Sequence, residues 1–384
     1  MTKLTIRQRI ALEANRALQK QKAKEHRLTT LFWESTLRCN LKCLHCGSDC
    51  KVASLTPDMP FEDLEPVLDS IARRYDPRTV FVIISGGEPL MRADLDECGR
   101  KLRERGFPWG MVTNGFALTP ERLERLVANG LRSISVSLDG LEEDHDWMRG
   151  RPTSFVRASE AIAAICRYNE TAGTPAANNA ANNAPNAAGP NAAPARPRIG
   201  FDAITCVNRR NLPHLPEIKE HLLSLGCRAW RVFPIVPMGR AREVPEFRLT
   251  GEEIRQTLDF IRETRREGIM KVNYACEDYL AGYEGEVRDT LFACDAGVSV
   301  GSVLIDGSVS ACTSIRSDYV QGNIYKEDFM DIWDNRFQKY RDHSWMRTGE
   351  CADCPHFRYC QGNGMHLRDD QGRILQCNLR LMED

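Results

Sequence analysis

The chain has 384 residues, of which 42% are hydrophobic and 27% are charged, and its formal net charge is -1. This length is too great for one small core, so we expect two or three packed units in a globular protein. A net charge near zero creates no overall field that would attract nucleic acid, so no nucleic-acid partner is expected.

The 15 cysteines are many for a chain without a secretory start. The first 27 residues lack the apolar core of a signal peptide. No segment has the apolar length that a membrane span needs. We therefore expect a cytoplasmic protein with no membrane span. In that reducing compartment disulfides are rare, and clustered cysteines more often bind metal or carry out redox chemistry.

Residues 1–30 alternate basic side chains with Ile6, Ile10, Ala14 and Leu18. This spacing predicts an N-terminal helix with an apolar stripe and a basic outer face. We expect the stripe to pack over one end of the protein, and the alternative is a docking surface for a partner peptide.

Between residues 31 and 240, short apolar runs alternate with longer amphipathic ones. The apolar runs predict six strands, at residues 31–37, 79–85, 109–113, 133–138, 199–206 and 230–236. Helical patterns lie between them, as at residues 92–105, 120–129 and 154–168. A repeated strand–helix–strand order predicts an α/β fold with a parallel sheet. Six units favour a partial (β/α)6 barrel over a closed barrel of eight.

Residues 171–197 consist almost entirely of Ala, Asn and Pro, with no bulky apolar side chain. Such a segment cannot bury enough surface to offset the entropy of ordering it. We therefore predict a disordered insert between the helix at residues 154–168 and the fifth strand.

After the sixth strand, residues 241–275 form a connector with one predicted helix at residues 251–268. The composition then changes, and cysteines follow among glycines and turns from residue 276 to residue 384. We interpret this last part as a small domain that is held together by metal more than by a large apolar core.

Three cysteines directly after the first predicted strand have the spacing C-x3-C-x2-C, at Cys39, Cys43 and Cys46. Iron–sulfur clusters normally take four cysteines, so three ligands would leave one iron open for a small molecule. A zinc site and unligated thiols are the alternatives. Cys50 lies outside this spacing, and we expect it not to be a ligand.

This motif resembles that of radical S-adenosylmethionine (SAM) enzymes, in which three cysteines hold one 4Fe-4S cluster and SAM binds the open iron. In that family the residue before the third cysteine is usually aromatic and stacks on adenine, and here it is His45. The family also has a glycine-rich element that binds the amino group of SAM, which corresponds here to Gly86, Gly87, Glu88 and Pro89. Glycines let the backbone approach closely, and Glu88 would supply charge for the ammonium. A plain strand-to-helix turn is the alternative.

Polar residues also follow the third and fourth predicted strands, in the sequences "TNG" and "SLDG". The resemblance implies that Asn114, Ser137 and Asp139 face the ribose and carboxylate of SAM. These residue types also form turns, so a purely structural role is the alternative. The implied reaction is one-electron cleavage of SAM to a 5'-deoxyadenosyl radical, which removes a hydrogen atom from the substrate. It requires a one-electron reductant such as flavodoxin or ferredoxin.

The C-terminal cysteines resemble the SPASM domain, an auxiliary-cluster module of radical SAM enzymes that mature peptides and proteins. The pattern is carried by Gly307 and by a set of cysteines, at Cys294, Cys312, Cys351, Cys354, Cys360 and Cys377. The last four of these can hold one 4Fe-4S cluster, and tetrahedral zinc is the alternative.

Two positions depart from that pattern. Gly364 stands where a further cysteine is expected, so a second auxiliary cluster would have Cys294 and Cys312 with Cys276 as its third ligand. That cluster could have an open iron, take a non-cysteine ligand such as Asp295 or His366, or be absent. The chain therefore has one or two auxiliary clusters. Thr313 replaces the aspartate that the sulfatase-maturing branch uses as a base, which argues against formylglycine formation.

The resemblance implies a radical SAM enzyme that modifies a peptide or protein side chain. In the branch with such C-terminal sequences, genes are often paired with a gene for a small lipoprotein, which is therefore a candidate substrate. The alternatives are a small-molecule substrate such as a tetrapyrrole, and a non-catalytic iron–sulfur electron carrier. No catalytic base can be assigned from the sequence.

Overall fold

The computed structural model describes residues 4–48, 50, 52–172, 197–275, 278–315 and 317–383. In these residues one ten-stranded sheet has the order β10-β9-β8-β1-β2-β3-β4-β5-β6-β7. The strands are β1 Thr30–Thr36, β2 Phe81–Gly86, β3 Trp109–Thr113, β4 Leu131–Ser137, β5 Gly200–Val207, β6 Ala229–Pro234, β7 Lys271–Tyr274, β8 Val300–Val303, β9 Ser308–Ser310 and β10 Gly322–Asn323. Strands β1 to β7 are all parallel to their neighbours, which confirms the α/β partial barrel.

The six predicted strands correspond to β1–β6, and β7 is an addition. β7 pairs with β6 from Lys271 to Tyr274, within the segment that we expected to be a helical connector only. Its sequence "KVNY" has no apolar run, because it lies at the edge of the sheet and leaves Lys271 exposed. A short edge strand with polar side chains gives little signal in the sequence.

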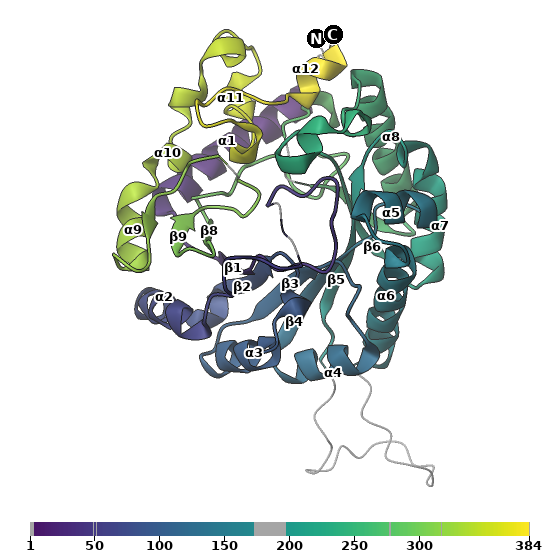
Figure 1. Ribbon diagram of the computed structural model, residues 1–384. Coiled ribbons are helices and arrows are strands. Elements are labelled where there is room, and N and C mark those ends of the chain that lie inside the picture. The colour runs from purple at the N-terminus through teal and green to yellow at the C-terminus, as the bar shows by residue number, and fades with distance from the viewer. Residues whose placement is uncertain are drawn as a thin grey trace, which may run out of the picture.

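Helices cover the outer surface of the curved sheet (Figure 1). Their bounds are α1 Ile6–Glu25, α2 Phe61–Arg74, α3 Leu95–Glu104, α4 Pro120–Ala128, α5 Glu142–Arg149, α6 Ser154–Thr171, α7 Leu215–Ser224, α8 Gly251–Glu267, α9 Phe329–Arg336, α10 Gln338–Arg341, α11 Phe357–Cys360 and α12 Asn378–Glu383. α6 extends through Thr171, so the first residue of the predicted insert is helical. Residues 173–196 of that insert lie outside the described residues.

The main core lies between the sheet and the helices, and it continues into the C-terminal part of the chain. Trp33, Trp109 and Trp230 belong to the same cluster of buried side chains as Trp333 and Tyr340. The C-terminal part therefore shares an apolar core with the barrel, whereas we expected metal to be its main support. Aromatic side chains that are separated by turns form no periodic pattern by which the sequence could reveal this core.

The sheet itself joins the two parts of the molecule. β8 is parallel to β1, with register pairs from Thr30 opposite Val300 to Trp33 opposite Val303. β9 then pairs antiparallel with β8, and a turn that contains Gly307 connects them. The turn after β8 is thereby held beside the carboxyl end of β1, where the Ile305 N–H donates to Glu34 Oε2 at 3.2 Å.

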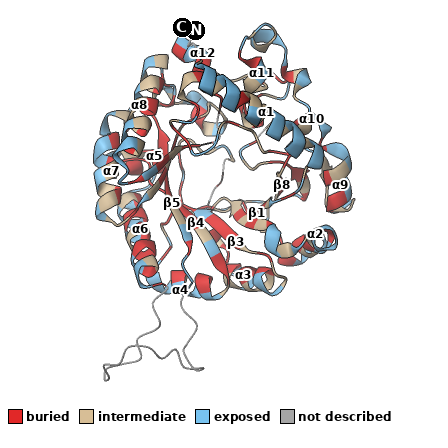
Figure 2. Ribbon diagram, turned by 180° about the vertical axis from the view of Figure 1, so that it is seen from behind, coloured by how far each residue is buried: buried red, intermediate tan, exposed pale blue. Residues whose placement is uncertain are grey.

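Helix α1 crosses the C-terminal part, but its orientation differs from our prediction (Figure 2). Gln8 and Asn15 each donate a side-chain hydrogen bond, at 3.0 Å, to a carbonyl of residues 282 and 292 respectively. Leu12 is the buried side chain of the helix, and the face that packs inward has the helical spacing 8, 12, 15, 19. The predicted packing stripe is wrong, because its largest members are exposed: Ile6 by 79%, Ile10 by 66% and Leu18 by 53%. No helix in the described residues is long and apolar enough to cross a bilayer.

Candidate active site

The loop after β1 brings the predicted cluster cysteines together. Cys39, Cys43 and Cys50 are buried in one small apolar cluster, and Cys46 packs against it half-buried. Hydrogen bonding from Cys50 lowers the pKa of Cys46 to about 5, so Cys50 lies closer to the motif than its spacing suggested. Three soft sulfur donors on one short loop fit an iron–sulfur cluster with an open iron. The absence of a ligand role for Cys50 stays a prediction.

The carboxyl end of α5 is hydrogen-bonded to the backbone of this loop. Lys42 and Leu44 donate their backbone N–H groups to the carbonyls of Arg149 and Met148, at 3.2 and 2.8 Å. Gly150 follows with a positive φ of 66°, and a Cβ at this position would lie 2.5 Å from the Lys42 carbonyl oxygen. Only glycine therefore lets the helix end approach the loop this closely.

Arg149 adds a buried charge to the same contact. Its Nη1 lies 3.6 Å from Cys43 Sγ, and its Nη2 forms an ion pair with Asp139, whose side chain has no exposed surface. Burial alone would raise the pKa of Asp139, but Arg149, together with His45, His145 and the Cys206 N–H, outweighs burial and holds this pKa below its usual range. Burial raises the pKa of Cys43, and Arg149 opposes that rise. Our sequence reasoning missed Arg149, because an arginine in the last turn of a helix is ordinary.

Asp139 is committed to partners within the protein. Its Oδ1 accepts a hydrogen bond from the Cys206 backbone at 2.9 Å, and the carboxylate also pairs with Arg149. These contacts give Asp139 a structural role, and its predicted contact with SAM stays a prediction. Ser137, at the end of β4, is 9% exposed, and its predicted contact with SAM likewise stays a prediction.

The glycine-rich element lies directly against the entrance of the cluster loop. Gly87 and Glu88 donate their N–H groups to the carbonyls of Thr36 and Arg38, at 2.7 and 2.9 Å. A Cβ on Gly86 or Gly87 would lie 2.1 or 2.2 Å from those same carbonyl oxygens. Glycine is required here by this close approach of two backbones.

Glu88 is held by contacts within the protein, and its predicted role as the partner of an ammonium group stays a prediction. It is 1% exposed, and its carboxylate accepts hydrogen bonds from Thr113 Oγ1 at 2.6 Å and from the Asn114 N–H at 2.7 Å. Burial raises its pKa despite these donors. These contacts tie the end of β2 to the end of β3, and Pro89 starts the short turn that follows.

Asn114 is positioned by that contact and reaches the cluster loop. Its Nδ2 donates to Asn40 Oδ1 at 2.8 Å and lies 3.9 Å from Cys39 Sγ. Its Oδ1 accepts from the Phe116 N–H at 2.9 Å. The polar ends of β2 and β3 therefore form a continuous hydrogen-bonded edge beside the first cysteine.

A central cavity of about 460 Å³ opens above these residues. One wall contains His45, Gly86 and Gly87, which we predicted to contact SAM. Strands β5 and β6 contribute a second wall, and the C-terminal part contributes Cys312, Thr313 and His366. Burial lowers the pKa of His45 to about 3, so its ring is neutral at ordinary pH. His45 Nδ1 is buried and has no partner among the described residues. An unpaired buried nitrogen beside glycine backbone fits a polar ligand such as SAM.

Arg231 is the cationic side chain on the barrel wall of this cavity. Its Nε and Nη2 bind Asp202, at 2.6 and 3.2 Å, and Nη2 also donates to Ser135 Oγ at 2.9 Å. The side chain remains 40% exposed, and the bonds that hold it do not use Nη1. Sequence reasoning missed this residue, because it lies inside a predicted strand with no motif around it.

The C-terminal cysteines fall into two groups. A cavity of about 330 Å³ is lined by all four predicted ligands of one cluster, at Cys351, Cys354, Cys360 and Cys377. Cys294 lies close enough to Cys312 for their charges to interact, and the Met365 N–H donates to it. Cys276 lies outside the described residues. His366 and Cys312 share the wall of the central cavity, whereas Asp295 lies 3.9 Å from Lys22 of α1. Over the described ranges, no three His, Cys, Asp or Glu side chains converge as the ligands of a single ion would.

The cluster loop, the glycine-rich element and the parallel partial barrel define the protein as an enzyme of the radical SAM class. Comparison with known families agrees. Residues 33–174 match the Radical SAM superfamily, and residues 294–355 match SPASM, an iron–sulfur cluster-binding domain. The chain therefore contains a radical SAM domain followed by a SPASM domain, which imply SAM, a 4Fe-4S cluster and auxiliary iron–sulfur clusters.

Individual relatives match along most of the chain. An AdoMet-dependent heme synthase of Methanosarcina barkeri is 28% identical, over 86% of this chain and 90% of the relative. The mycofactocin maturase MftC of Mycolicibacterium smegmatis is 26% identical, over 87% of this chain and 77% of the relative. Among solved structures, anSMEcpe with bound AdoMet has a TM-score of 0.66 at 19% identity, covering 92% of this chain and 94% of that one.

Proposed function

We propose that this enzyme modifies a peptide or protein side chain that enters the central cavity. The observation that carries the proposal is the composition of the cavity wall. It joins the SAM-side residues His45, Gly86 and Gly87 to Thr313 and His366 of the C-terminal part. A substrate held there would touch both parts of the protein.

When bound, SAM and the cluster supply a 5'-deoxyadenosyl radical that removes hydrogen from the substrate. The chain itself would hold the cluster with Cys39, Cys43 and Cys46. The glycine backbone and His45 Nδ1 would orient SAM, and the apolar walls of the cavity would exclude water from the reaction. The relatives named as maturases support a peptide or protein as substrate.

A tetrapyrrole is a second candidate, which the heme synthase relatives favour. Arg231 supports it as well, because a half-exposed guanidinium held by Asp202 and Ser135 is prepared to bind a carboxylate. Carboxylate groups of a tetrapyrrole would meet this arginine on the cavity wall.

The class of reaction is tested by anaerobic reconstitution and reduction, followed by measurement of 5'-deoxyadenosine. Wild-type protein should form it from SAM. A variant with Cys39, Cys43 and Cys46 all changed to alanine should form none, while it keeps iron bound at the C-terminal cysteines. If reconstituted wild-type protein forms no 5'-deoxyadenosine with or without candidate substrates, the proposal fails. Loss of all iron in the triple variant would contradict separate sites.

The substrate class is tested with two substrates in parallel. If the first candidate is right, a small peptide encoded by a neighbouring gene and co-expressed with the enzyme should gain a crosslink or lose hydrogen. Mass spectrometry of the peptide measures this change. Iron coproporphyrin III should instead be consumed if the second is right. In that case Arg231→Gln should weaken its binding, whereas Arg228→Gln, an exposed arginine at the start of β6, should leave binding unchanged.

A further inference from the structure

The outer face of α1 is an apolar surface that no part of the described chain covers. Ile6 and Ile10 are exposed by 79% and 66%, and Leu18, exposed by 53%, continues the row at the rim of a groove beside residues 288–293. Residues 6 and 18 are separated by about 18 Å along a helix that rises 1.5 Å per residue. Isolated exposed apolar residues are common, but Ile6, Ile10 and the exposed Ala14 follow one another at intervals of one helical turn, so their side chains form a row along the helix. Figure 2 shows this face of α1 as largely exposed.

Cations flank this row. Arg7, Arg9 and Lys24 are exposed basic residues of α1, and the single exposed acid of the helix is Glu25. Lys20 lines the inner cavity and Lys22 lies 3.9 Å from Asp295, so neither is counted with the outer face. The other acid, Glu13, is engaged by Arg16 and by Arg358 of α11. The outer face therefore combines apolar contact area with a local positive field, although the whole chain has a net charge of only -1.

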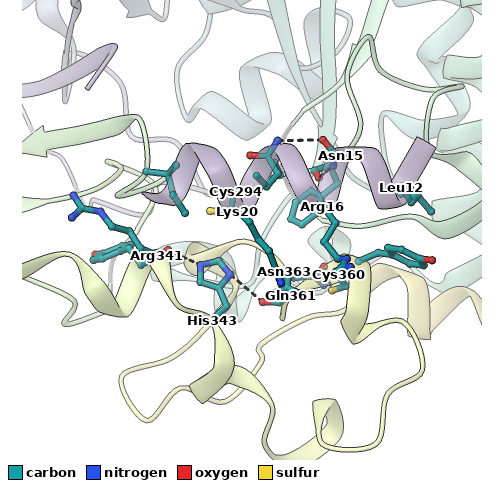
Figure 3. Close-up of a pocket in the computed structure, with 17 residues that line it drawn as sticks. Leu12, Asn15, Arg16, Lys20, Cys294, Arg341, His343, Cys360, Gln361 and Asn363 are labelled. Carbon is teal, nitrogen blue, oxygen red and sulfur yellow. Dashed lines mark hydrogen bonds between the residues drawn. The ribbon is translucent and has the colours of Figure 1, made fainter. Parts of the chain in front are cut away.

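The inner face of α1 fixes the position of this row relative to the C-terminal cysteines. A cavity of about 110 Å³ lies between α1 and the C-terminal part, and Cys294 and Cys360 are among its lining residues. Figure 3 shows Arg16 and Lys20 extending from the helix toward the side on which Cys360 lies. The hydrogen bonds of Gln8 and Asn15 to the C-terminal part hold the helix in this orientation.

We infer that the outer face of α1 docks an acidic, one-electron donor protein. The reaction of this enzyme class consumes one electron for each SAM that is cleaved, and that electron must come from another molecule. In the transfer step the donor is oxidised by one electron, a cluster is reduced by one electron, and no bond forms or breaks. A donor bound on α1 lies directly over cysteines that we expect to hold auxiliary clusters.

An acidic protein fits this face better than an anionic membrane does. Both would be attracted by the cations, but only a redox protein gains from the position above Cys294 and Cys360. Electrostatic attraction would speed its association and orient it, and the three apolar side chains would supply contact area. The inference rests on the enzyme class and is independent of the substrate.

The test compares two electron sources for SAM cleavage by the full-length, reconstituted enzyme. One is reduced flavodoxin, an acidic carrier that must dock, and the other is dithionite, a small reductant that needs no docking. The variant carries Ile6→Ser, Ile10→Ser and Leu18→Ser together. Its flavodoxin-driven rate at low flavodoxin should fall by about tenfold or more, since several contacts of an interface are lost at once. Its dithionite-driven rate should stay within about twofold of wild type, since the SAM site is untouched.

Ile269→Ser is the matched control, because Ile269 is 56% exposed but lies in the turn between α8 and β7. It should leave both rates unchanged. Binding of oxidised flavodoxin, followed by fluorescence anisotropy of its flavin, repeats the comparison without catalysis and should weaken with added salt. The inference is overturned if flavodoxin does not bind wild-type enzyme, if the triple variant binds it equally well, or if dithionite-driven cleavage falls as much as flavodoxin-driven cleavage. It is also overturned if the three substitutions abolish flotation with anionic phosphatidylserine vesicles while flavodoxin binding persists.

Discussion

Replacing Arg149 with methionine should destabilise the protein strongly, although the residue lies at the end of a short helix. Arg149→Met removes the partner of Asp139 and the cation beside Cys43, but it keeps the apolar volume and the backbone carbonyl that holds the cluster loop. The change therefore tests the buried charge and leaves the brace between α5 and the loop in place.

The expected loss in the free energy of unfolding follows from the burial of this ion pair. The side chains of Arg149 and Asp139 are only 9% and 0% exposed, so loss of the arginine leaves an uncompensated carboxylate in a low-dielectric site. Breaking such a buried pair costs about 3–5 kcal/mol, whereas removal of both charges is often nearly neutral. Asn at position 139 would still accept the hydrogen bond from the Cys206 N–H, which is 2.9 Å long in the wild type. The double variant Arg149→Met/Asp139→Asn should therefore recover most of the loss.

The assay is urea unfolding of the apo-proteins under anaerobic conditions, followed by far-ultraviolet circular dichroism. Arg157→Met serves as a control, because Arg157 forms an exposed ion pair with Glu160 that should contribute at most about 1 kcal/mol. The expected order of free energies of unfolding is wild type and Arg157→Met highest, the double variant slightly lower, and Arg149→Met lowest. If Arg149→Met is as stable as Arg157→Met, or if the double variant is as unstable as the single one, the reasoning about the buried pair is wrong.

Three further predictions concern the same loop. Gly150→Ala should destabilise the cluster loop by about 1–3 kcal/mol and lower the iron content of the core cluster. The alanine Cβ would collide with the Lys42 carbonyl oxygen, and the positive φ at this position disfavours any residue other than glycine. Unchanged iron content would contradict this prediction. Cys50→Ala should retain 5'-deoxyadenosine formation and the spectrum of the core cluster, and loss of either would make Cys50 a ligand. The pKa of Asp139 is held below its usual value, so its stabilising effect is present above about pH 4 and lost as the pH falls through the folded-state pKa. The variant Arg149→Met/Asp139→Asn should therefore lose less stability than wild type below about pH 4 in the urea assay, and equal losses would count against the assignment.

The first six strands of the barrel could be predicted because each contains a short apolar stretch of strand length between helical patterns. β7 was not predicted because it is an edge strand with polar side chains. The shared core around Trp333 was not predicted because its aromatic residues follow no regular period. For α1, the apolar spacing was real but the assigned face was wrong. Hydrogen bonds from Gln8 and Asn15 to distant carbonyls set the orientation, and no local pattern encodes them.

The site divides in the same way. Cys39, Cys43 and Cys46 could be found because their spacing is local and specific. Arg149 could not, because its contact with Cys43 joins residues 106 positions apart and depends on how α5 packs against the loop. Arg231 could not be found either, because only the folded structure shows that it lines the central cavity. Sequence spacing therefore indicated the cofactor, whereas the residues that surround it required the fold.

The pairing of β1 with β8 has a consequence for the order in which the protein is made. β1 carries the cluster loop at its end, yet one of its two neighbours is separated from it by most of the chain, with Thr30 opposite Val300. During synthesis β1 can pair with β2 early, but its other edge stays open until the ribosome has added β8. Contacts between such distant segments form slowly. A truncated or stalled chain that lacks β8 would therefore leave this edge of β1, the strand that leads into the cluster loop, without its hydrogen-bonded neighbour.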